Sequence, residues 1–367
     1  MHYYVAVIFL FLILHLVILP KICKNVVYSV YFEPDYKRPV EEIINNYHIL
    51  DIKNDLPDAN IAVLVITSKR ETSYLNRTLL SLFKEISRSE EKHPTFICSA
   101  DPDHGELNEL FVPASVKVLQ PCLNSACHKF EVKEREKKYV RDFVACHRDM
   151  LEELKNDVKY VLCLEDDVAL MDNFFPTLSS ILSFRGSRLI TNPWLDIKLY
   201  VMPRMKGFAF DIMPLVELLA MSCLLVFFLD SAIGSLPFIE NPRKSFSKFL
   251  FMFILCICTV LAISRQGITH WRRIHPQFYA WRPVPNFGTP AVLYNRLYLE
   301  EALKHLEANK DALDISISRF RRKNKLAGFL LEPNLVRHLG IKSSLGGHHQ
   351  KRRDNGDIRE FLVNHSI

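Results

Sequence analysis

The sequence predicts an α/β domain with a largely parallel sheet, behind a membrane anchor and interrupted by a membrane hairpin. Two observations predict it. Continuous apolar runs such as Ile61–Thr67 and Tyr160–Leu164 are typical of strands buried on both faces, and they alternate with amphipathic helical patterns. The hydrophobic residues, 49% of the chain, gather in Tyr3–Leu19, Ile212–Leu229 and Phe249–Ile263. This pattern excludes disorder, a fibrous repeat, a polytopic channel and a simple soluble enzyme.

The first apolar run is long enough to span a bilayer and is not followed by a small-residue cleavage site. We therefore expect a retained signal-anchor over residues 1–20, followed by a stem over residues 21–59. Lys21 and Lys24 follow the run and no basic residue precedes it, which favours the orientation opposite to a cytosolic N-terminus.

The two central runs predict a transmembrane hairpin over residues 212–263 with a basic, cytosolic loop. The alternative is a pair of buried core helices, because Glu217 interrupts the first run and the second run is short. If the hairpin spans the membrane, the flanking segments 60–211 and 264–345 lie on one side, as two halves of one domain must. Residues 346–367 read as a solvated basic tail.

A lumenal domain would make Asn76-Arg77-Thr78 and Asn364-His365-Ser366 acceptable glycosylation sequons. The nine cysteines show no zinc pattern. Cys98 and Cys163 lie in strand-like runs, where small buried hydrophobic residues are the usual interpretation. Cys122 and Cys127 lie in a polar loop and suggest a disulfide.

The remaining elements follow in order along the chain. A helical pattern starts at Thr72, and a second amphipathic helix covers Val140 to Leu154. Further predicted segments are the strands Pro94–Ser99, Val116–Leu119, Leu199–Phe210 and Ala291–Leu293 and the helix Arg296–Leu306. Ligands of such sheets bind beyond the carboxyl ends of the strands.

Three consecutive acids, Glu165, Asp166 and Asp167, directly follow a buried strand. Their mutual repulsion favours a compensating cation, and hard carboxylate oxygens suit Mn²⁺ or Mg²⁺, whose open positions hold a diphosphate. The alternative is a solvated acidic turn that caps a helix. The apolar strand immediately before the acids favours the metal site.

Other candidate site residues carry weaker signals. Thr67 and Arg70 leave the first strand and fit nucleotide binding, or equally a helix cap with exposed basic residues. Asp101 and Asp103 follow the second strand and could reach a uridine or ribose, or form turns.

Two residues near the C-terminus complete the candidates. His338 could be a second metal ligand, although a lone histidine is more often a packing residue. Asp314 starts a helix-like stretch, where it could deprotonate an acceptor hydroxyl or be an ordinary N-terminal helix charge. The chain has no Walker loop and no G-x-G-x-x-G, which excludes kinases and nicotinamide enzymes. Its net charge of +6 is too diffuse to predict a nucleic-acid partner.

These segments carry a resemblance to a known family. The segments IAVLVIT, SKRETSYLNRTLLSL and YVLCLEDDVAL resemble the donor-binding half of GT-A (Rossmann-like) glycosyltransferases, nearest to the N-acetylglucosaminyltransferase IV-like group. The ending EPNLVRHLGIKSSL is similar to a C-terminal element of that group. With a hairpin inserted in the domain, the chain resembles the Golgi GPI-glycan N-acetylgalactosaminyltransferases over roughly Ile61 to Leu345.

The resemblance implies a role for each matched residue. Asp167 becomes the metal-binding acid of a DXD-like motif, with Mn²⁺ or Mg²⁺ as cofactor, and Asp166 and Glu165 contact ribose or support the metal shell. His338 becomes a metal or diphosphate contact. Asp314 becomes the general base of an inverting displacement, because α-linked UDP-GalNAc would give a β-linked product. The first acid is Glu, so the motif departs from a strict DXD.

The resemblance also implies a multi-pass Golgi membrane enzyme with a lumenal catalytic domain, which adds N-acetylgalactosamine to the mannose core of GPI-anchored protein glycans. Three alternatives stay open at this point. One is an N-glycan N-acetylglucosaminyltransferase of the same group, and another is a non-catalytic membrane scaffold with a degenerate GT-A fold. The third, a processive polysaccharide synthase, lacks its Q-x-x-R-W element, which Gln266–Arg273 matches poorly.

Overall fold

The chain divides into two compact units. Unit 1 comprises Met1–Arg38, Met202–Arg273 and Asn355–Ile367, and unit 2 comprises Pro39–Val201 and Ile274–Asp354. The computed structural model describes residues 2–23, 29, 60–68, 74–99, 112–121, 135–154, 158–202, 208, 212–233, 242–286, 288, 290–309 and 311–339.

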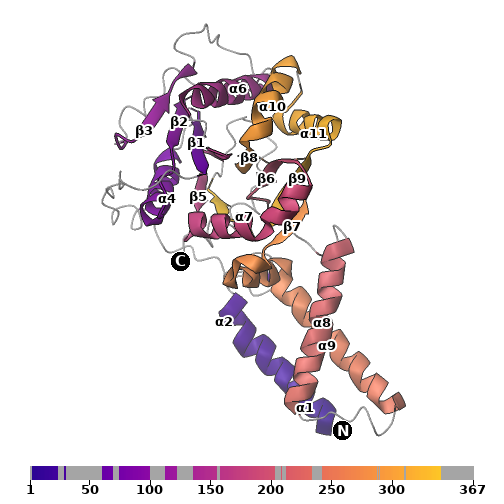
Figure 1. Cartoon of the computed structure of the whole chain (residues 1–367). Helices are drawn as coiled ribbons and strands as arrows, with labels where there is room; N and C mark the ends of the chain where they lie inside the picture. The colour runs from indigo at the N-terminus through magenta and orange to yellow at the C-terminus, as the bar shows by residue number, and fades with distance from the viewer. Residues whose placement is uncertain are drawn as a thin grey trace. The chain divides into compact units, whose positions relative to one another are not determined.

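Unit 2 is built on an eight-stranded sheet of order β3-β2-β1-β4-β8-β6-β9-β7 among the described residues (Figure 1). Six strands share one direction, while β8 and β7 run antiparallel to their neighbours. The predicted α/β class with a mostly parallel sheet is thereby confirmed, and it is consistent with a Rossmann-like fold. The strands are β1 Ile61–Thr67, β2 Thr95–Ser99, β3 Val116–Leu119, β4 Tyr160–Glu165, β6 Trp194–Lys198, β7 Ala280–Pro283, β8 Ala291–Asn295 and β9 Ala327–Glu332.

The centre of the sheet explains the sequence pattern. β1 pairs in parallel with β2 on one side and with β4 on the other, and all seven of its residues are buried. A strand covered on both faces has no reason to alternate polar and apolar residues, which is why IAVLVIT is continuous. The predicted strands at 95–99, 116–119, 160–164 and 291–293 are confirmed.

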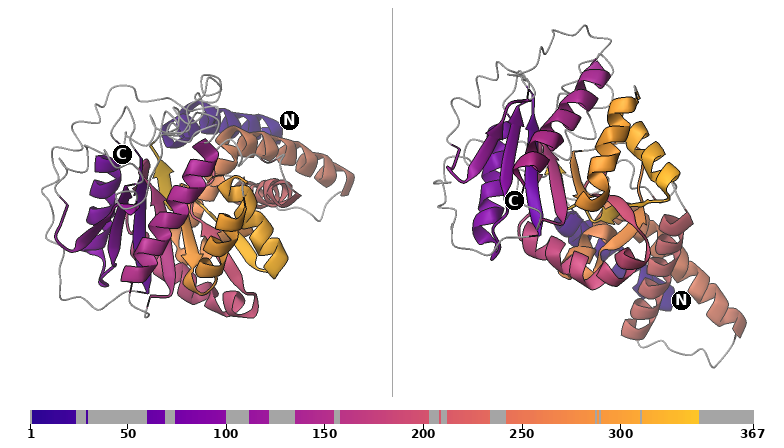
Figure 2. Two further views of the ribbon diagram at one scale, coloured as in Figure 1. Left: turned by 90° about the horizontal axis from the view of Figure 1, so that it is seen from above. Right: turned by 45° about the horizontal axis from the view of Figure 1, so that its top comes forward.

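Helices flank the sheet. α6, α10 and α11 cover one face of the sheet (Figure 2). Their apolar sides are buried in one core cluster with Ala62, Leu64 and Ile66, alternate residues of β1. α4 contacts α7 and the short strand β5. The helices are α4 Leu75–Arg88, α6 Arg135–Glu153, α7 Phe174–Thr191, α10 Arg296–Ala308 and α11 Leu313–Asn324. The predicted helices along 72–86, 140–154 and 296–306 are confirmed over their described residues.

The predicted strand Leu199–Phe210 is wrong over its first four residues. β6 ends at Lys198, and residues 199–202 have no strand structure, whereas residues 203–207, 209 and 210 lie outside the described part of the chain. All five residues of β6 are buried, including Asp196, which lies 3.3 Å from the guanidinium of Arg321.

A disulfide joins Cys98 in β2 to Cys146 in α6. Cys98 is buried in a strand, as predicted, but the sequence did not indicate its disulfide, because its partner is 48 residues away along the chain and is brought close only by packing of the helix on the sheet. Cys163 is free and buried, as expected. Cys122 and Cys127 lie outside the described residues. Disulfides persist mainly in oxidising compartments such as the secretory pathway.

The described residues of unit 1 lie mainly in apolar helices. Two stretches, Ile212–Ser231 and Phe246–Ile274, are long and apolar enough to cross a membrane, and only 22% and 33% of their most apolar windows are buried. Helices in a soluble core are mostly buried, so this exposure disfavours the core-helix alternative. A shorter apolar helical stretch covers Val7–Cys23. The elements are α1 His2–Ile13, the π-helical turn η1 Leu14–Ile18, α2 Leu19–Cys23, α8 Ile212–Ile233 and α9 Pro242–Trp271.

α8 and α9 form an antiparallel pair. Val226 packs against Met252 near one end of the pair, and Leu218 packs against Val260 nearer the other. α9 breaks at Ser264, whose φ of 71° is non-helical. Regular helix therefore reaches the predicted end of the hairpin at residue 263, and a second helical segment continues to Trp271.

Candidate functional site

The acidic triplet lies at the carboxyl edge of the sheet. Glu165 is the last residue of β4, and Asp166 and Asp167 form the turn into β5, Val168–Leu170. Both aspartates are only 3% exposed. The alternative of a solvated acidic turn that caps a helix is wrong, because both aspartates are buried and a strand follows them.

Asp166 is held by groups from β1 and α4. Its Oδ2 accepts hydrogen bonds from the Thr67 hydroxyl at 2.9 Å and from the Ser68 backbone N–H at 3.2 Å. The buried Thr78 hydroxyl donates to the Asp166 carbonyl at 2.7 Å. Hydrogen bonds to a carboxylate stabilise its charged form. Thr67, predicted from its place after the first strand, therefore contacts the acid triplet directly.

Asp167 meets His338 across a two-stranded ladder. β10, Val336–His338, pairs antiparallel with β5, and the Leu339 N–H donates to the Asp167 carbonyl at 2.6 Å. This ladder brings His338 Nε2 to 3.4 Å from Asp167 Oδ2. Two side chains far apart in the sequence thus present one oxygen and one nitrogen to the same space.

Two residues that the sequence interpretation missed support His338. The ring of Tyr200 stacks on the imidazole, with centroids 5.7 Å apart and an interplanar angle of 27°. Asn334 fixes the backbone beside Tyr200, since its side-chain amide accepts from the Val201 N–H at 3.0 Å and donates to the Val201 carbonyl at 2.9 Å. The only sequence signal for Asn334 is a polar amide between two apolar strands.

Glu165 faces a different partner. Its Oε1 accepts a hydrogen bond from the Tyr139 hydroxyl of α6 at 2.8 Å, and its backbone N–H donates to the Pro290 carbonyl at 2.8 Å. The first acid is therefore tied to α6 and to the segment before β8, while the second and third acids face β1 and β10.

Asp314 lies in the first turn of α11, where its Oδ1 accepts from the Ile315 N–H at 2.9 Å. Burial lowers the pKa of Lys198, the last residue of β6, to about 8, and the negative charges of Asp196 and, to a lesser extent, Asp314 oppose that fall. The Lys198 ammonium donates to the Pro285 carbonyl at 2.9 Å. β6 is two strands from β4, or about 10 Å along the edge.

A buried ion pair lies beneath this part of the edge. Asp196 and Arg321 are 1% and 8% exposed and 3.3 Å apart. Burial raises the pKa of Asp196, and the positive charges of Arg321 and Lys198 oppose that rise. The pair anchors α11, and with it Asp314, to the sheet.

The geometry of Asp167 and His338 fits a divalent cation. Two adjacent ligands of an octahedral ion at about 2.1 Å lie about 3 Å apart, close to the observed 3.4 Å. Among the described residues no group of three or more His, Cys, Asp or Glu side chains could hold a metal by itself. Mg²⁺-type sites typically combine one or two protein ligands with substrate phosphates and water, and two protein ligands suit that arrangement.

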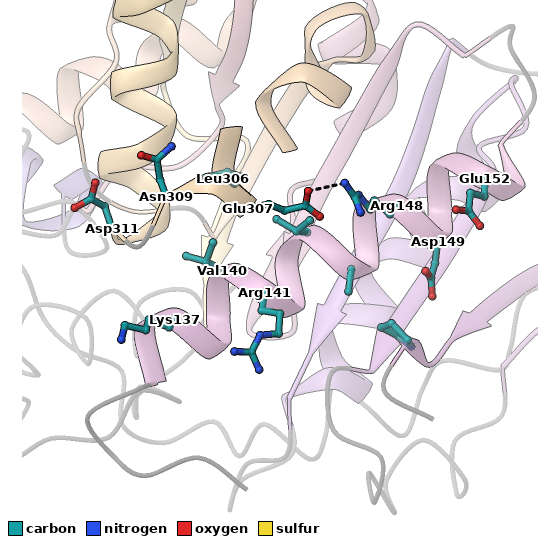
Figure 3. Close-up of a pocket in the computed structure, with 13 residues that line it drawn as sticks. Lys137, Val140, Arg141, Arg148, Asp149, Glu152, Leu306, Glu307, Asn309 and Asp311 are labelled. Atoms are coloured by element: carbon teal, nitrogen blue, oxygen red, sulfur yellow. Dashed lines mark hydrogen bonds and ion pairs between the residues drawn. The ribbon is translucent and has the colours of Figure 1, made fainter. Parts of the chain in front are cut away.

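The other predicted contacts, Arg70, Asp101 and Asp103, lie outside the described residues. A separate cavity of about 600 Å³ lies between α6 and the end of α10 (Figure 3). Arg148 and Glu307 form an ion pair of 2.6 Å across it. It contains none of the predicted site residues.

One comparison with known proteins identifies the family. The family model described as GPI-N-acetylgalactosamine transferase PGAP4 matches residues 61–337. The match begins with β1 and includes β5 and Asp167, and it ends within β10, one residue before His338. The chain belongs to the GPI-N-acetylgalactosamine transferase PGAP4 family and is a glycosyltransferase.

Proposed function

We propose that this protein is a metal-dependent, inverting glycosyltransferase that moves N-acetylgalactosamine from UDP-GalNAc to the mannose core of GPI-anchored protein glycans. The observation that carries the proposal is the pairing of Asp167 and His338 at the carboxyl edge of the sheet, 3.4 Å apart. Nucleotide ligands of parallel sheets bind at this edge.

In this proposal Asp167 and the neutral imidazole of His338 hold Mn²⁺ or Mg²⁺. The cation, when bound, supplies Lewis-acid stabilisation of the departing diphosphate. Asp166 positions the turn through Thr67 and Thr78, and Glu165 remains the candidate contact for the ribose. Tyr200 keeps the imidazole plane fixed by stacking on it.

The reaction is a single displacement. The acceptor hydroxyl oxygen forms a bond to the anomeric carbon while the bond to the UDP oxygen breaks, and UDP leaves with that electron pair. Asp314 takes the hydroxyl proton. Its charge acts on Lys198, which ends β6 about two strand spacings from β4, and this supports a role for Asp314 at the same edge of the sheet.

We further propose that α8 and α9 span the Golgi membrane and that Val7–Cys23 belongs to the N-terminal anchor, with unit 2 in the lumen. The apolar lengths of α8 and α9 support the spanning part. The Cys98–Cys146 disulfide supports the lumen over the cytosol, where thiols are kept reduced. A membrane-bound enzyme suits a lipid-linked acceptor.

The test is transfer from UDP-GalNAc to a GPI acceptor by the purified full chain with Mn²⁺. We expect Asp167→Asn to lower kcat/KM by at least about 100-fold, because metal-bound carboxylates contribute several kcal/mol of transition-state stabilisation. The matched control is Asp172→Asn, since Asp172 is exposed and bonded only to surface cations in α4 among the contacts described. Equal activity of Asp167→Asn and Asp172→Asn would refute the metal role.

The donor is tested separately. Binding of UDP-GalNAc and UDP-GlcNAc to the full chain with Mn²⁺ is compared by calorimetry, and we expect UDP-GalNAc to bind more tightly. Tighter binding of UDP-GlcNAc would favour the N-glycan transferase alternative. Failure of either nucleotide to bind would favour the non-catalytic scaffold.

A further inference from the structure

An ion-pair cluster lies inside the apolar unit 1. Glu217 is on α8, six positions into a helix that is otherwise suited to a membrane. Its two carboxylate oxygens contact different arginines, Arg265 Nε in α9 at 2.9 Å and Arg272 Nη2, directly after α9, at 2.7 Å. Ionisable side chains in such helices are costly and usually mark a functional site or a paired network.

Arg272 has donor capacity beyond this pair. Its Nη1 is buried and has no hydrogen-bond partner among the residues that the structure describes. A guanidinium has five N–H donors, and a buried donor without a hydrogen bond costs free energy comparable to that of a lost hydrogen bond. A buried donor of this kind calls for an acceptor, such as an anionic oxygen or water, beyond the one that Glu217 supplies.

The surroundings of the cluster match a membrane boundary. After the break at Ser264, α9 ends in His270 and Trp271, directly followed by Arg272 and Arg273, and Trp271 is 54% exposed. Tryptophan and basic residues concentrate at the interface between lipid and water. Leu218, Val260 and Ile268 form an apolar cluster in the same part of the helix pair. Positive charge and apolar surface therefore occur together here.

We propose that Arg265 and Arg272, oriented by Glu217, bind the phosphodiester of an inositol phospholipid. The planar guanidinium fork matches phosphate oxygens, and the neighbouring apolar helices favour a lipid over a soluble phosphate. The choice of an inositol lipid rests on the proposed function, whose acceptor carries one. The cluster lies at the end of α8 and α9 where the chain joins unit 2, since α8 begins at Ile212 and α9 ends at Trp271.

The test measures lipid retention by the purified full chain, without donor sugar. The chain is delipidated in detergent, incubated with phosphatidylinositol, phosphatidylcholine or inorganic phosphate, and examined by native mass spectrometry. We expect roughly tenfold greater retention of phosphatidylinositol than of phosphatidylcholine, because phosphatidylinositol is a net anion, whereas the choline ammonium neutralises the phosphodiester of phosphatidylcholine and competes with the arginines for it. Arg272→Gln removes this preference. The matched control, Lys248→Gln, keeps it, because Lys248 lies about 24 Å from Ser264 along the regular part of α9.

Three results would overturn the proposal: no preference for phosphatidylinositol, an unchanged preference in Arg272→Gln, or equal retention of inorganic phosphate. A measurement on the unaltered chain guards against misfolding of the variant. Phosphatidylinositol with a photoreactive headgroup should label residues 264–273, and labelling only elsewhere would refute the site. The lipid assay does not measure sugar transfer, so its result can be interpreted even if the transferase assay fails. In the same way, a negative lipid result does not affect the test of the transferase activity.

Discussion

The Cys98–Cys146 disulfide predicts a measurable share of the stability of unit 2. Replacing both cysteines by alanine removes a crosslink between residues 48 positions apart. The chain-entropy relation for a closed loop of this size gives about 4 kcal/mol of lost stability at 25 °C. Both side chains are completely buried, so the lost sulfur contacts add to this value rather than reduce it.

The assay is urea unfolding of the solubilised chain, followed by tryptophan fluorescence. Trp194 is 3% exposed and its ring lies 5.7 Å from that of Tyr160, so its emission reports the sheet. The sequence has three tryptophans, and replacing Trp271 and Trp281 by phenylalanine leaves Trp194 as the sole reporter. The control is Cys163→Ala in the same background. Cys163 is a buried free thiol in β4, and its loss should cost only about 1 kcal/mol.

A difference below about 1 kcal/mol between the double variant and Cys163→Ala would refute the entropic reasoning. Alkylation of Cys98 and Cys146 in the unreduced, denatured protein would refute the disulfide itself. Retention of the disulfide after expression in a reducing cytosol would remove its support for a lumenal domain.

Three further variants test the site and its surroundings. Thr67→Val removes the hydroxyl that binds the Asp166 carboxylate, and a hydrogen bond to a charged group of about 1.5–3 kcal/mol predicts a roughly 10–100-fold loss of kcat/KM in the transferase assay. Burial lowers the pKa of Lys198 from 10.5 to about 8, so between these two pH values the unfolded chain binds more protons than the folded chain. The free energy of unfolding should therefore rise from pH 8 to 10.5, and Lys198→Met should remove this rise. Arg321→Met leaves the buried carboxylate of Asp196 without its counter-charge and should lower the free energy of unfolding of unit 2 by about 3–5 kcal/mol, measured in urea. Arg319→Met removes an exposed ion pair on the same helix and should cost at most about 1 kcal/mol.

Each of these has a contrary outcome. Wild-type kcat/KM in Thr67→Val would show that Asp166 needs no hydroxyl support. If the free energy of unfolding of Lys198→Met still rises between pH 8 and 10.5, the titrating group is not Lys198. Equal urea midpoints for Arg321→Met and Arg319→Met would show that the Asp196–Arg321 pair does not hold α11 to the sheet.

The strands buried on both faces could be predicted because their residues need no partner beyond the core. Ile61–Thr67 and Tyr160–Leu164 are apolar throughout, so composition and length suffice to identify them. β6 was missed because the charge of its Asp196 is compensated by Arg321, which lies in a helix more than a hundred residues later. Local sequence carries no information about such a partner.

The candidate site divides in the same way. The acids after β4 and the hydroxyl after β1 are visible in the sequence, because both follow apolar runs. The closeness of His338 to Asp167 depends on the pairing of two three-residue strands, β5 and β10, which are too short to produce a periodic pattern. Tyr200 and Asn334 were missed for the same reason, since each acts through a contact that exists only after the sheet is assembled.

The position of β8 has a consequence for the order in which the protein is made. β8 lies between β4 and β6, yet the ribosome reaches it only after α8 and α9. At about 5–20 residues per second, the roughly 90 residues between Lys198 and Ala291 delay this central strand by about 5–20 s. During that time the facing edges of β4 and β6 have no strand between them, and exposed strand edges promote aggregation. A substitution that slows the placement of the apolar helices should therefore lower the yield of folded enzyme rather than its turnover number. Cellular quality control should degrade the chains whose sheet remains incomplete.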